Sequence, residues 1–360
     1  MPDLEAVMLV GGKGTRLRPL TISAPKPMLP TAGVPFTAHQ LARARDAGVT
    51  HVVLATSYRA EVFEAYFGDG SAFGLELTYV TETEPLGTGG GIRNVADHLR
   101  SKPHDPVLIF NGDVLSGVDL RAQVETHRAS GAEVTLHLVE VEDPRAFGVV
   151  PTDDSGRVTA FLEKTPDPPT NRINAGCYVF NRAVIDAIPA GRRVSVERET
   201  FPGLLRDGAL VRGFVDSSYW LDLGTPAAFV QGSCDLVRGL ISSSALPGPV
   251  GEALLLHGAE VADDATVTGG TTLGRDVVVG AGAQVTGSVL FDSARVGAGA
   301  VVVNSIVGRG SVVGAGSALT GVVLGDEVRL GERNELRDGA RVFPGVQLPA
   351  AGVRFSSDQS

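Results

Sequence analysis

Three consecutive blocks near the end of the chain align without gaps: GSVLFDSARVGAGAVVV (residues 287–303), NSIVGRGSVVGAGSALT (304–320) and GVVLGDEVRLGERNELR (321–337). Each block carries an aliphatic residue at its fourth, tenth and sixteenth positions. Apolar residues therefore recur about every six residues, which is typical of a parallel β-helix whose coils bury their side chains by stacking. The blocks predict such a β-helix.

The same register extends on both sides of the three blocks. Aliphatic residues that we expect to point into the β-helix are Val261, Val267, Leu273, Val279, Val285, Leu290, Val296, Val302, Val307, Val313, Leu319, Leu324, Leu330, Leu336 and Val342. A β-sandwich rich in glycine and valine is the alternative, but a near-constant register over so many positions favours the β-helix. The stretch 242–249 has the composition of a linker. We therefore expect a β-helix domain over residues 246–360.

Residues 1–245 have a different pattern, in which short apolar runs alternate with helical stretches. Strands are expected at 6–10, 52–55, 75–80, 107–110, 134–141 and 177–180, with helices at 38–47 and 60–67. Alternation of this kind predicts an α/β domain with a mainly parallel sheet. Ligands of such sheets bind at the carboxyl ends of the strands.

The composition limits the classes of function. The chain has 360 residues and a formal net charge of -10, which argues against a general nucleic-acid-binding protein. Its two cysteines, Cys177 and Cys234, form no disulfide framework or zinc motif. The longest apolar runs are too short to span a membrane, and no basic segment precedes the first strand. We expect a cytoplasmic protein.

A glycine-rich loop follows the first expected strand and reads Gly11-Gly12-Lys13-Gly14-Thr15-Arg16. Backbone amides in such a loop can bind phosphate oxygens. The spacing fits neither a P-loop nor a dinucleotide-binding fingerprint, because Leu17 stands where the latter needs its third glycine. Two prolines flank Lys26, and we expect them to hold it in an extended backbone. The alternative is a proline-rich surface loop with a solvated lysine.

Seven motifs in order carry a resemblance to a known family. They lie at residues 9–30, 85–90 (PLGTGG), 110–113 (FNGD), 147–149 (FGV), 161–164 (FLEK), 173–180 (INAGCYVF) and 220–226 (WLDLGTP). The chain resembles the nucleotidyltransferases that make NDP-sugars, and within them the group that forms GDP-mannose. The resemblance implies a Rossmann-like catalytic domain over residues 1–245 and a left-handed β-helix after it. It also implies GTP and mannose 1-phosphate as substrates and Mg²⁺ as cofactor.

The chemistry implied is attack of a sugar phosphate on the α-phosphorus of a nucleoside triphosphate. The attacking oxygen is already ionised near neutral pH, so alignment and positive charge matter more than a general base. We expect Arg16 and Lys26 to neutralise the triphosphate. Asp113 and Asp222 are the expected Mg²⁺ ligands. Alternatively, Asp113 could be an ordinary turn residue, and Asp222 could cap the helix that follows it.

The resemblance implies further binding residues. Those expected to bind the nucleotide are Val10, Gly11, Gly12, Gly14, Thr15, Arg16, Lys26, Glu82, Pro85, Gly87, Thr88, Asn111, Gly112 and Asp113. Those expected to bind the sugar phosphate are Gly148, Glu163, Lys164, Asn174 and Asp222. A surface Glu–Lys pair is the alternative for Lys164, and Glu163 would point to the opposite face only if both residues were extended.

The base is assigned from Glu82 and Glu84, which precede Pro85. Guanine presents two donors on one edge, and one carboxylate can accept both of them. Relatives that use thymine or uracil typically carry a glutamine nearby, so the glutamates favour guanine, although both could be solvated loop charges. We expect Gly87 to let the base approach the backbone closely.

Three other functions stay open. One is a sister enzyme that makes dTDP-, UDP- or CDP-glucose, and another is a non-catalytic regulatory paralogue. The third is an acyltransferase in the β-helix, which is disfavoured because that region offers only His257 as a base. We expect the β-helix instead to mediate self-association, through weakly polar outward positions such as Val301, Val303, Ala318 and Val322. The chemistry, which lies before residue 230, is expected not to depend on it.

Overall fold

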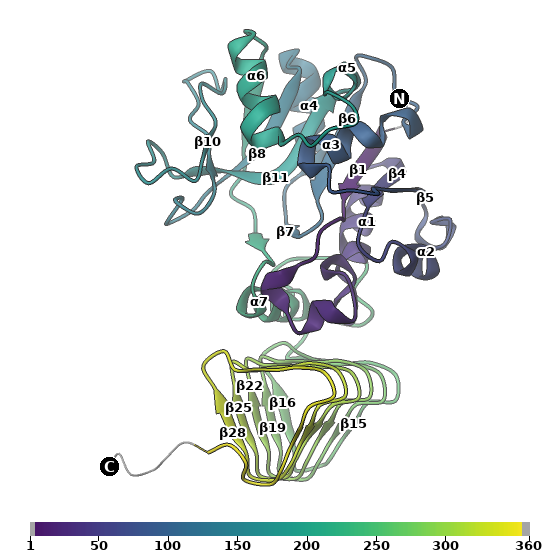
Figure 1. Cartoon of the computed structure of the whole chain (residues 1–360), viewed down its shortest axis with the longest axis vertical. Helices are drawn as coiled ribbons and strands as arrows, with labels where there is room; N and C mark the ends of the chain where they lie inside the picture. The colour runs from purple at the N-terminus through teal and green to yellow at the C-terminus, as the bar shows by residue number, and fades with distance from the viewer. Residues whose placement is uncertain (1–3, 355–360) are drawn as a thin grey trace. The chain divides into compact units, whose positions relative to one another are not determined.

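The computed structural model describes residues 4–354, which group into two compact units (Figure 1). The sheet unit contains residues up to 12 and residues 40–220. The β-helix unit contains residues 13–39 and the chain from residue 221 onward. The predicted boundary at residue 245 stays a prediction. Within residues 4–354, no helix has the length and apolar character needed to cross a membrane.

One mixed sheet forms the core of the sheet unit. Its main path runs β10–β9–β11–β6–β1–β4–β5, and β8 joins β11 to β12. The pairs β1–β4, β1–β6, β4–β5 and β8–β12 are parallel, whereas β11 is antiparallel to its neighbours. The prediction of a mainly parallel α/β domain is confirmed. The strands are β1 (Leu4–Leu9), β4 (Val49–Thr56), β5 (Glu76–Thr81), β6 (Pro106–Asn111), β8 (Val134–Glu140), β9 (Gly148–Val149), β10 (Leu162–Glu163), β11 (Arg172–Asn181) and β12 (Val211–Val215).

Helices pack beside this sheet because its central strands are apolar on both faces. Strand β6 illustrates the point, since Val107, Leu108 and Ile109 are all completely buried. The helices are α1 (Phe36–Asp46), α2 (Glu61–Phe67), α3 (Gly87–Asn94), α4 (Leu120–Ser130), α5 (Arg182–Ala187) and α6 (Phe201–Arg206). The expected helices at 38–47 and 60–67 correspond to α1 and α2.

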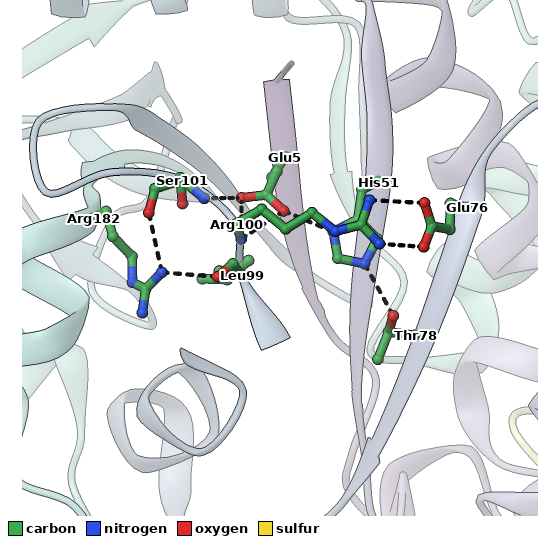
Figure 2. A network of polar contacts seen from close by, with 8 residues as sticks. All are labelled: Glu5, His51, Glu76, Thr78, Leu99, Arg100, Ser101 and Arg182. Atoms are coloured by element: carbon green, nitrogen blue, oxygen red, sulfur yellow. Dashed lines mark hydrogen bonds and ion pairs between the residues drawn. The ribbon is translucent and has the colours of Figure 1, made fainter. Parts of the chain in front are cut away.

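A buried carboxylate ties the start of β1 to its neighbours (Figure 2). Glu5 accepts a hydrogen bond from the backbone of Ser101 at 2.7 Å and lies 2.7 Å from His51 Nδ1. The Arg100 amide donates to both carboxylate oxygens. Burial raises the pKa of Glu5, but the bonds from His51, Arg100 and Ser101 outweigh it and lower the pKa to about 2. The charged carboxylate therefore helps to hold the sheet together.

The second part of the chain forms a β-helix, as predicted. Its strands make three parallel sheets in which partners lie 17 or 18 residues apart, for example Val289 with Ile306 and Val323 with Arg341. The expected inward series is confirmed, since all its members belong to or pack against one continuous apolar core. Val322 is a correction, because it was expected to point outward and is completely buried in that core. The handedness stays a prediction.

The three sheets have the following strands. The first contains β14 (Ala253–Leu255), β17 (Thr271–Leu273), β20 (Val289–Leu290), β23 (Ile306–Val307), β26 (Val323–Leu324) and β29 (Arg341–Val342). The second contains β15 (Glu260–Val261), β18 (Val278–Val279), β21 (Arg295–Val296), β24 (Val312–Val313), β27 (Arg329–Leu330) and β30 (Gln347–Leu348). The third contains β16 (Thr266–Thr268), β19 (Gln284–Thr286), β22 (Val301–Val303), β25 (Ala318–Thr320) and β28 (Glu335–Arg337).

Four short strands of the described residues lie outside these sheets. Strands β2 (Pro30–Thr31) and β3 (Val34–Pro35) form a small hairpin. Strands β7 (Val114–Ser116) and β13 (Trp220–Asp222) are the other two. Helix α7 (Pro226–Val237) then precedes the β-helix. It buries its apolar face within the β-helix unit, where Phe229 and Val230 join a core that includes residues of the β-helix.

Candidate functional site

The first part of the 13–39 segment, residues 14–29, is a series of tight turns rather than an open loop. Gly14 has a φ of 54°, and a Cβ atom there would lie 2.9 Å from the Cβ of Lys26. The Thr21 hydroxyl donates to the Gly14 carbonyl at 2.9 Å. Lys26 begins a 3₁₀ turn, so the expectation that it is extended is wrong. Pro25 and Leu29, on either side of the 3₁₀ segment, are extended. Lys26 precedes Pro27 and is therefore biased towards an extended backbone, but the turn in which it lies overrides that bias.

Two cations and one carboxylate converge in the β-helix unit. Lys26 Nζ lies 3.8 Å from Asp222 Oδ1, and the Lys26 side chain is only 11% exposed. A Cβ atom on Gly224 would lie 2.7 Å from Arg16 Nη2 and 2.8 Å from Asp222 Oδ1. The structure thus brings together three of the four predicted catalytic residues. Positive charge at such a place can bind phosphate oxygens.

Asp222 ends strand β13 and does not cap the helix that follows. The residue before α7 is Thr225, whose hydroxyl accepts the Ala228 amide at 3.2 Å. This excludes the helix-cap reading of Asp222. Thr15, another predicted nucleotide-binding residue, is exposed at the start of a 3₁₀ turn.

The start of the glycine-rich loop belongs to the sheet unit. Val10 donates to the carbonyl of Ala55 at 3.1 Å and thereby continues the β1–β4 pairing. The Gly12 amide donates to the Ser57 hydroxyl at 3.1 Å, and a Cβ atom on Gly11 would lie 2.8 Å from that hydroxyl. Gly12 has a φ of 111°, which glycine adopts readily. The two glycines are thus needed for the turn at the carboxyl end of β1.

Asp113 lies just beyond β6, at the carboxyl end of the strand as predicted. The Gly112 amide donates to the Leu9 carbonyl at 3.0 Å, and a Cβ atom on Gly112 would collide with that oxygen. Only glycine allows β6 to turn so tightly against the end of β1. Asp113 is half-buried there. Its position fits a ligand-binding carboxylate at the edge where parallel strands end.

A buried tyrosine connects two predicted binding residues. Asn174 Nδ2 donates to the Tyr178 hydroxyl at 2.9 Å, and Asn111 hydrogen-bonds with the same tyrosine. The pairing of β11 with β8 is interrupted between Asn174 and Tyr178, where Gly176 has a φ of 76°. Burial raises the pKa of Tyr178, so its hydroxyl stays protonated. The expected nucleotide-binding Asn111 and sugar-binding Asn174 therefore share one rigid network.

The remaining sugar-phosphate residues lie together at β9 and β10. Lys164 has a φ of 54°, and its amide donates to the Phe147 carbonyl at 3.0 Å. Its Nζ lies 3.8 Å from Glu163 Oε1, so the two side chains are neighbours and do not point to opposite faces. A Cβ atom on Gly148 would lie 2.8 Å from the ring of Phe161 and 3.1 Å from Glu163 Oε2. Lys164 itself is 63% exposed and available to an anion.

The residues assigned to the base have structural contacts of their own. Glu82 Oε2 accepts the Leu86 amide at 3.3 Å, and burial raises the pKa of Glu82. A Cβ atom on Gly87 would lie 2.6 Å from the Val194 carbonyl oxygen. Packing within the chain therefore requires glycine at this position, whether or not a base binds there. Pro85 and Glu84 are exposed. Base recognition by Glu82 stays a prediction.

Thr88 is also engaged within the sheet unit. Its hydroxyl donates to Glu197 Oε2 at 2.8 Å and accepts the Val196 amide at 3.0 Å. These bonds attach the start of α3 to the segment that precedes α6. The role of Thr88 in nucleotide binding stays a prediction.

Comparison with known proteins identifies the family. The family described as Nucleotidyl transferase matches residues 5–239, and a GMPPB C-terminal domain matches residues 250–350. The chain belongs to the nucleotidyl transferase family. The predicted family and the predicted enzyme class are therefore confirmed.

Relatives within this family match over long stretches. A mannose-1-phosphate guanylyltransferase of Mycobacterium tuberculosis is 62% identical over 357 residues, which cover 99% of each chain. A mannose-1-phosphate guanyltransferase of Neurospora crassa is 38% identical and covers 72% of each. Among solved structures, HddC from Yersinia pseudotuberculosis complexed with GMP-PN is 27% identical, with a TM-score of 0.55, and the match covers 64% of this chain and 98% of that one.

Some contacts of the candidate residues were not predicted from the sequence. Ser57 follows β4 and accepts the Gly12 amide, while Thr21 holds the Gly14 carbonyl. Their positions carried a signal, since Ser57 follows an apolar strand and Thr21 lies within the first motif. Arg341 is a third case, because its Nη1 donates to the carbonyls of Arg16 and Arg18.

Proposed function

We propose that this chain transfers GMP from GTP to mannose 1-phosphate and so makes GDP-mannose and pyrophosphate. The observation that carries the proposal is the 62% identity, over 99% of both chains, to a mannose-1-phosphate guanylyltransferase. The converging charges of Arg16, Lys26 and Asp222 agree with phosphate chemistry. The regulatory-paralogue alternative is disfavoured because the glycine-rich loop and both aspartates are intact.

The reaction needs alignment more than proton transfer. A phosphate oxygen of mannose 1-phosphate forms a bond to the α-phosphorus of GTP as the bond to the β-phosphate oxygen breaks, and pyrophosphate leaves in line. Arg16 and Lys26 would bind the triphosphate and offset the charge on the departing pyrophosphate. Lys164 would bind the sugar phosphate, with Glu163 and Asn174 on the sugar hydroxyls. Oriented groups of this kind avoid the entropic cost of bringing two substrates together.

We further propose that Asp113 and Asp222 hold Mg²⁺. Both are carboxylates, the hard oxygen donors that Mg²⁺ takes. A Cβ atom on Gly224 would lie 2.8 Å from Asp222 Oδ1, so the glycine keeps this oxygen clear of a neighbouring side chain. When bound, Mg²⁺ supplies positive charge to crowded phosphates. Asp222 would in addition be oriented by Lys26, which lies 3.8 Å from it.

The substrate proposal is tested by a matrix of triphosphates and sugar 1-phosphates. Pyrophosphate release would be measured for GTP, dTTP, UTP and CTP against mannose 1-phosphate and glucose 1-phosphate. We expect the highest kcat/KM for GTP with mannose 1-phosphate. Preference for dTTP, UTP or CTP with glucose 1-phosphate would instead assign the chain to a sister activity. No turnover with any pair would favour the regulatory paralogue.

Self-association through the β-helix also remains a proposal. The third sheet of the β-helix presents Val301, Val303 and Ala318, which are half-buried in a single chain. Flat sheet faces of this kind are prone to pair, and two-fold pairing is the commonest solution. Light scattering of the full-length protein should therefore give a mass above that of one chain. A strict monomer at micromolar concentration would contradict the proposal.

A further inference from the structure

One outward column of the β-helix is covered by the chain's own 13–39 segment. The column runs through the first sheet of the β-helix, coil by coil, as Thr272, Val289, Ile306, Val323 and Arg341. Its three apolar members are at most 2% exposed although they point out of the β-helix. They share a core with α7 and the 13–39 segment, made by Leu17, Leu20, Leu29, Phe229, Val230, Cys234, Val289, Phe291, Ile306 and Val323.

The column is polar at both ends, where it meets backbone and hydroxyl groups. At one end the Thr272 hydroxyl lies 3.4 Å from that of Ser233, which in turn accepts the Ala32 amide at 2.8 Å. At the other end Arg341 Nη1 donates to the carbonyls of Arg16 and Arg18, both at 2.8 Å. The β-helix therefore holds the segment by an apolar strip between two polar contacts.

The contact of Arg341 is the one nearest to the chemistry. The Arg16 and Arg18 carbonyls belong to the turn from which the Arg16 side chain extends toward Asp222 and Gly224. Hydrogen bonds from a charged guanidinium are stronger than neutral ones and have a fixed geometry. One guanidinium nitrogen that holds two carbonyls thus fixes the turn on both sides of Leu17, which is itself completely buried.

We propose that Arg341 is a positioning residue for nucleotidyl transfer, and that the last coils of the β-helix are thereby part of the catalytic apparatus. Arg341 holds the backbone of residues 16–18, and this backbone in turn presents the Arg16 guanidinium to the triphosphate. The inference rests on the proposed function, because it requires that the 13–39 segment binds the triphosphate of GTP. The expectation that the chemistry does not depend on self-association is separate from this proposal and stays a prediction.

The test compares two arginines that occupy equivalent places on neighbouring sheets. Arg341 is the first residue of β29 and Arg329 is the first residue of β27, and both are exposed. Arg341→Met keeps most of the aliphatic stem but removes the donors, and Arg329→Met is the matched control. We expect Arg341→Met to lower kcat/KM for GTP about ten- to a hundredfold, because small misplacements of a charged group cost this much. Arg329→Met should match the wild type, and Arg341→Lys should recover part of the loss.

A second measurement separates positioning from simple stabilisation. Amide hydrogen exchange of residues 13–29 should speed up in Arg341→Met but not in Arg329→Met, with thermal midpoints of all proteins nearly equal. Activity within twofold of wild type in Arg341→Met would overturn the proposal. So would a loss explained wholly by a lower thermal midpoint. Absence of turnover in the wild type with GTP and mannose 1-phosphate would contradict the proposed function instead. The hydrogen-exchange result would still show whether Arg341 holds the backbone of residues 13–29.

Discussion

The two groups of site residues are held in place by different kinds of packing. In the sheet unit, Asn111 ends β6 and Asp113 lies just beyond it, so the register of β6 against β1 fixes where both side chains emerge. In the β-helix unit, Arg16 and Lys26 lie in tight turns with little regular structure of their own. Their support is a buried apolar core that the turns share with α7 and the β-helix. Asp113 and Asn111 thus depend on strand pairing. Arg16 and Lys26 depend on a β-helix surface that lies more than 250 residues away in the sequence.

This difference has a consequence for stability and function. A strand-end residue keeps its place as long as the central sheet is folded, because β6 is paired with β1 on one edge and with β11 on the other. A turn held by side-chain packing can loosen locally while the rest of the unit stays folded. Substitutions that loosen the 13–39 segment should therefore change GTP binding before they change global stability, whereas substitutions in the sheet should do the reverse.

The largest effect is expected from the two predicted metal ligands, one in each unit. Asp113→Asn and Asp222→Asn should each lower turnover by about 10²-fold or more, because neutral amides replace charged ligands where phosphate charge must be offset. Circular dichroism and thermal midpoints should stay close to wild type. EDTA should stop the wild-type reaction, and added Mg²⁺ should restore it. Near-normal turnover in either variant would remove that aspartate from the site.

The buried carboxylate of the sheet unit should affect stability alone. The folded-state pKa of Glu5 is about 2 and its ordinary value is 4.5, so its charge stabilises the fold above pH 4.5 and this contribution is lost as the pH falls toward 2. The shift corresponds to about 3 kcal/mol. Glu5→Gln should lower the thermal midpoint clearly at pH 7 and much less near pH 3, with kcat unchanged below the midpoint.

The exposed Glu76 is the control for that experiment. It pairs with Arg100 in the same network, but its side chain is 54% exposed (Figure 2). Pairs at the surface contribute little, so Glu76→Gln should shift the midpoint only slightly. Equal midpoint shifts for Glu5→Gln and Glu76→Gln would show that burial of the Glu5 carboxylate is not what matters.

Substitutions at two adjacent residues of β23 should destabilise the protein about as much as Glu5→Gln, but they should differ in their effect on KM for GTP. Ile306 points outward to the 13–39 segment and Val307 points into the β-helix, and both are completely buried. Replacement of either by alanine should destabilise the protein by about 1–4 kcal/mol. Only Ile306→Ala should also raise KM for GTP, because only Ile306 supports the turns that carry Arg16 and Lys26. Equal KM values in the two variants would argue that the segment holds its shape without the β-helix.

The features predicted from the sequence are those with a local or periodic signal. Apolar periodicity gave the β-helix register through Val342, and the position of Asp113 after an apolar strand placed it at the sheet edge. The contact of Arg341 with Arg16 had no such signal, because it joins residues 325 positions apart and depends on how two segments pack. The extended Lys26 and the outward Val322 were wrong for a related reason: tertiary packing decided both, one through turns over residues 14–28 and the other through a corner between strands.

The smallest effect concerns the base. Glu82 directly follows β5, and its Oε2 accepts the Leu86 amide. Glu82→Gln keeps an oxygen for that bond but removes the charge that two guanine donors would share. Loss of such a paired contact is worth about 1–3 kcal/mol of discrimination between bases.

The measurement is the ratio of kcat/KM for GTP to that for UTP in Glu82→Gln, with Glu84→Gln as the control. Glu84 is exposed and makes a suitable neighbour of the same charge. We expect the ratio to fall about tenfold in Glu82→Gln and to stay constant in Glu84→Gln. A fall in activity with both nucleotides at a constant ratio would assign Glu82 to the structure of the turn before α3 alone. The reverse pattern, with selectivity lost only in Glu84→Gln, would transfer the recognition of guanine to Glu84.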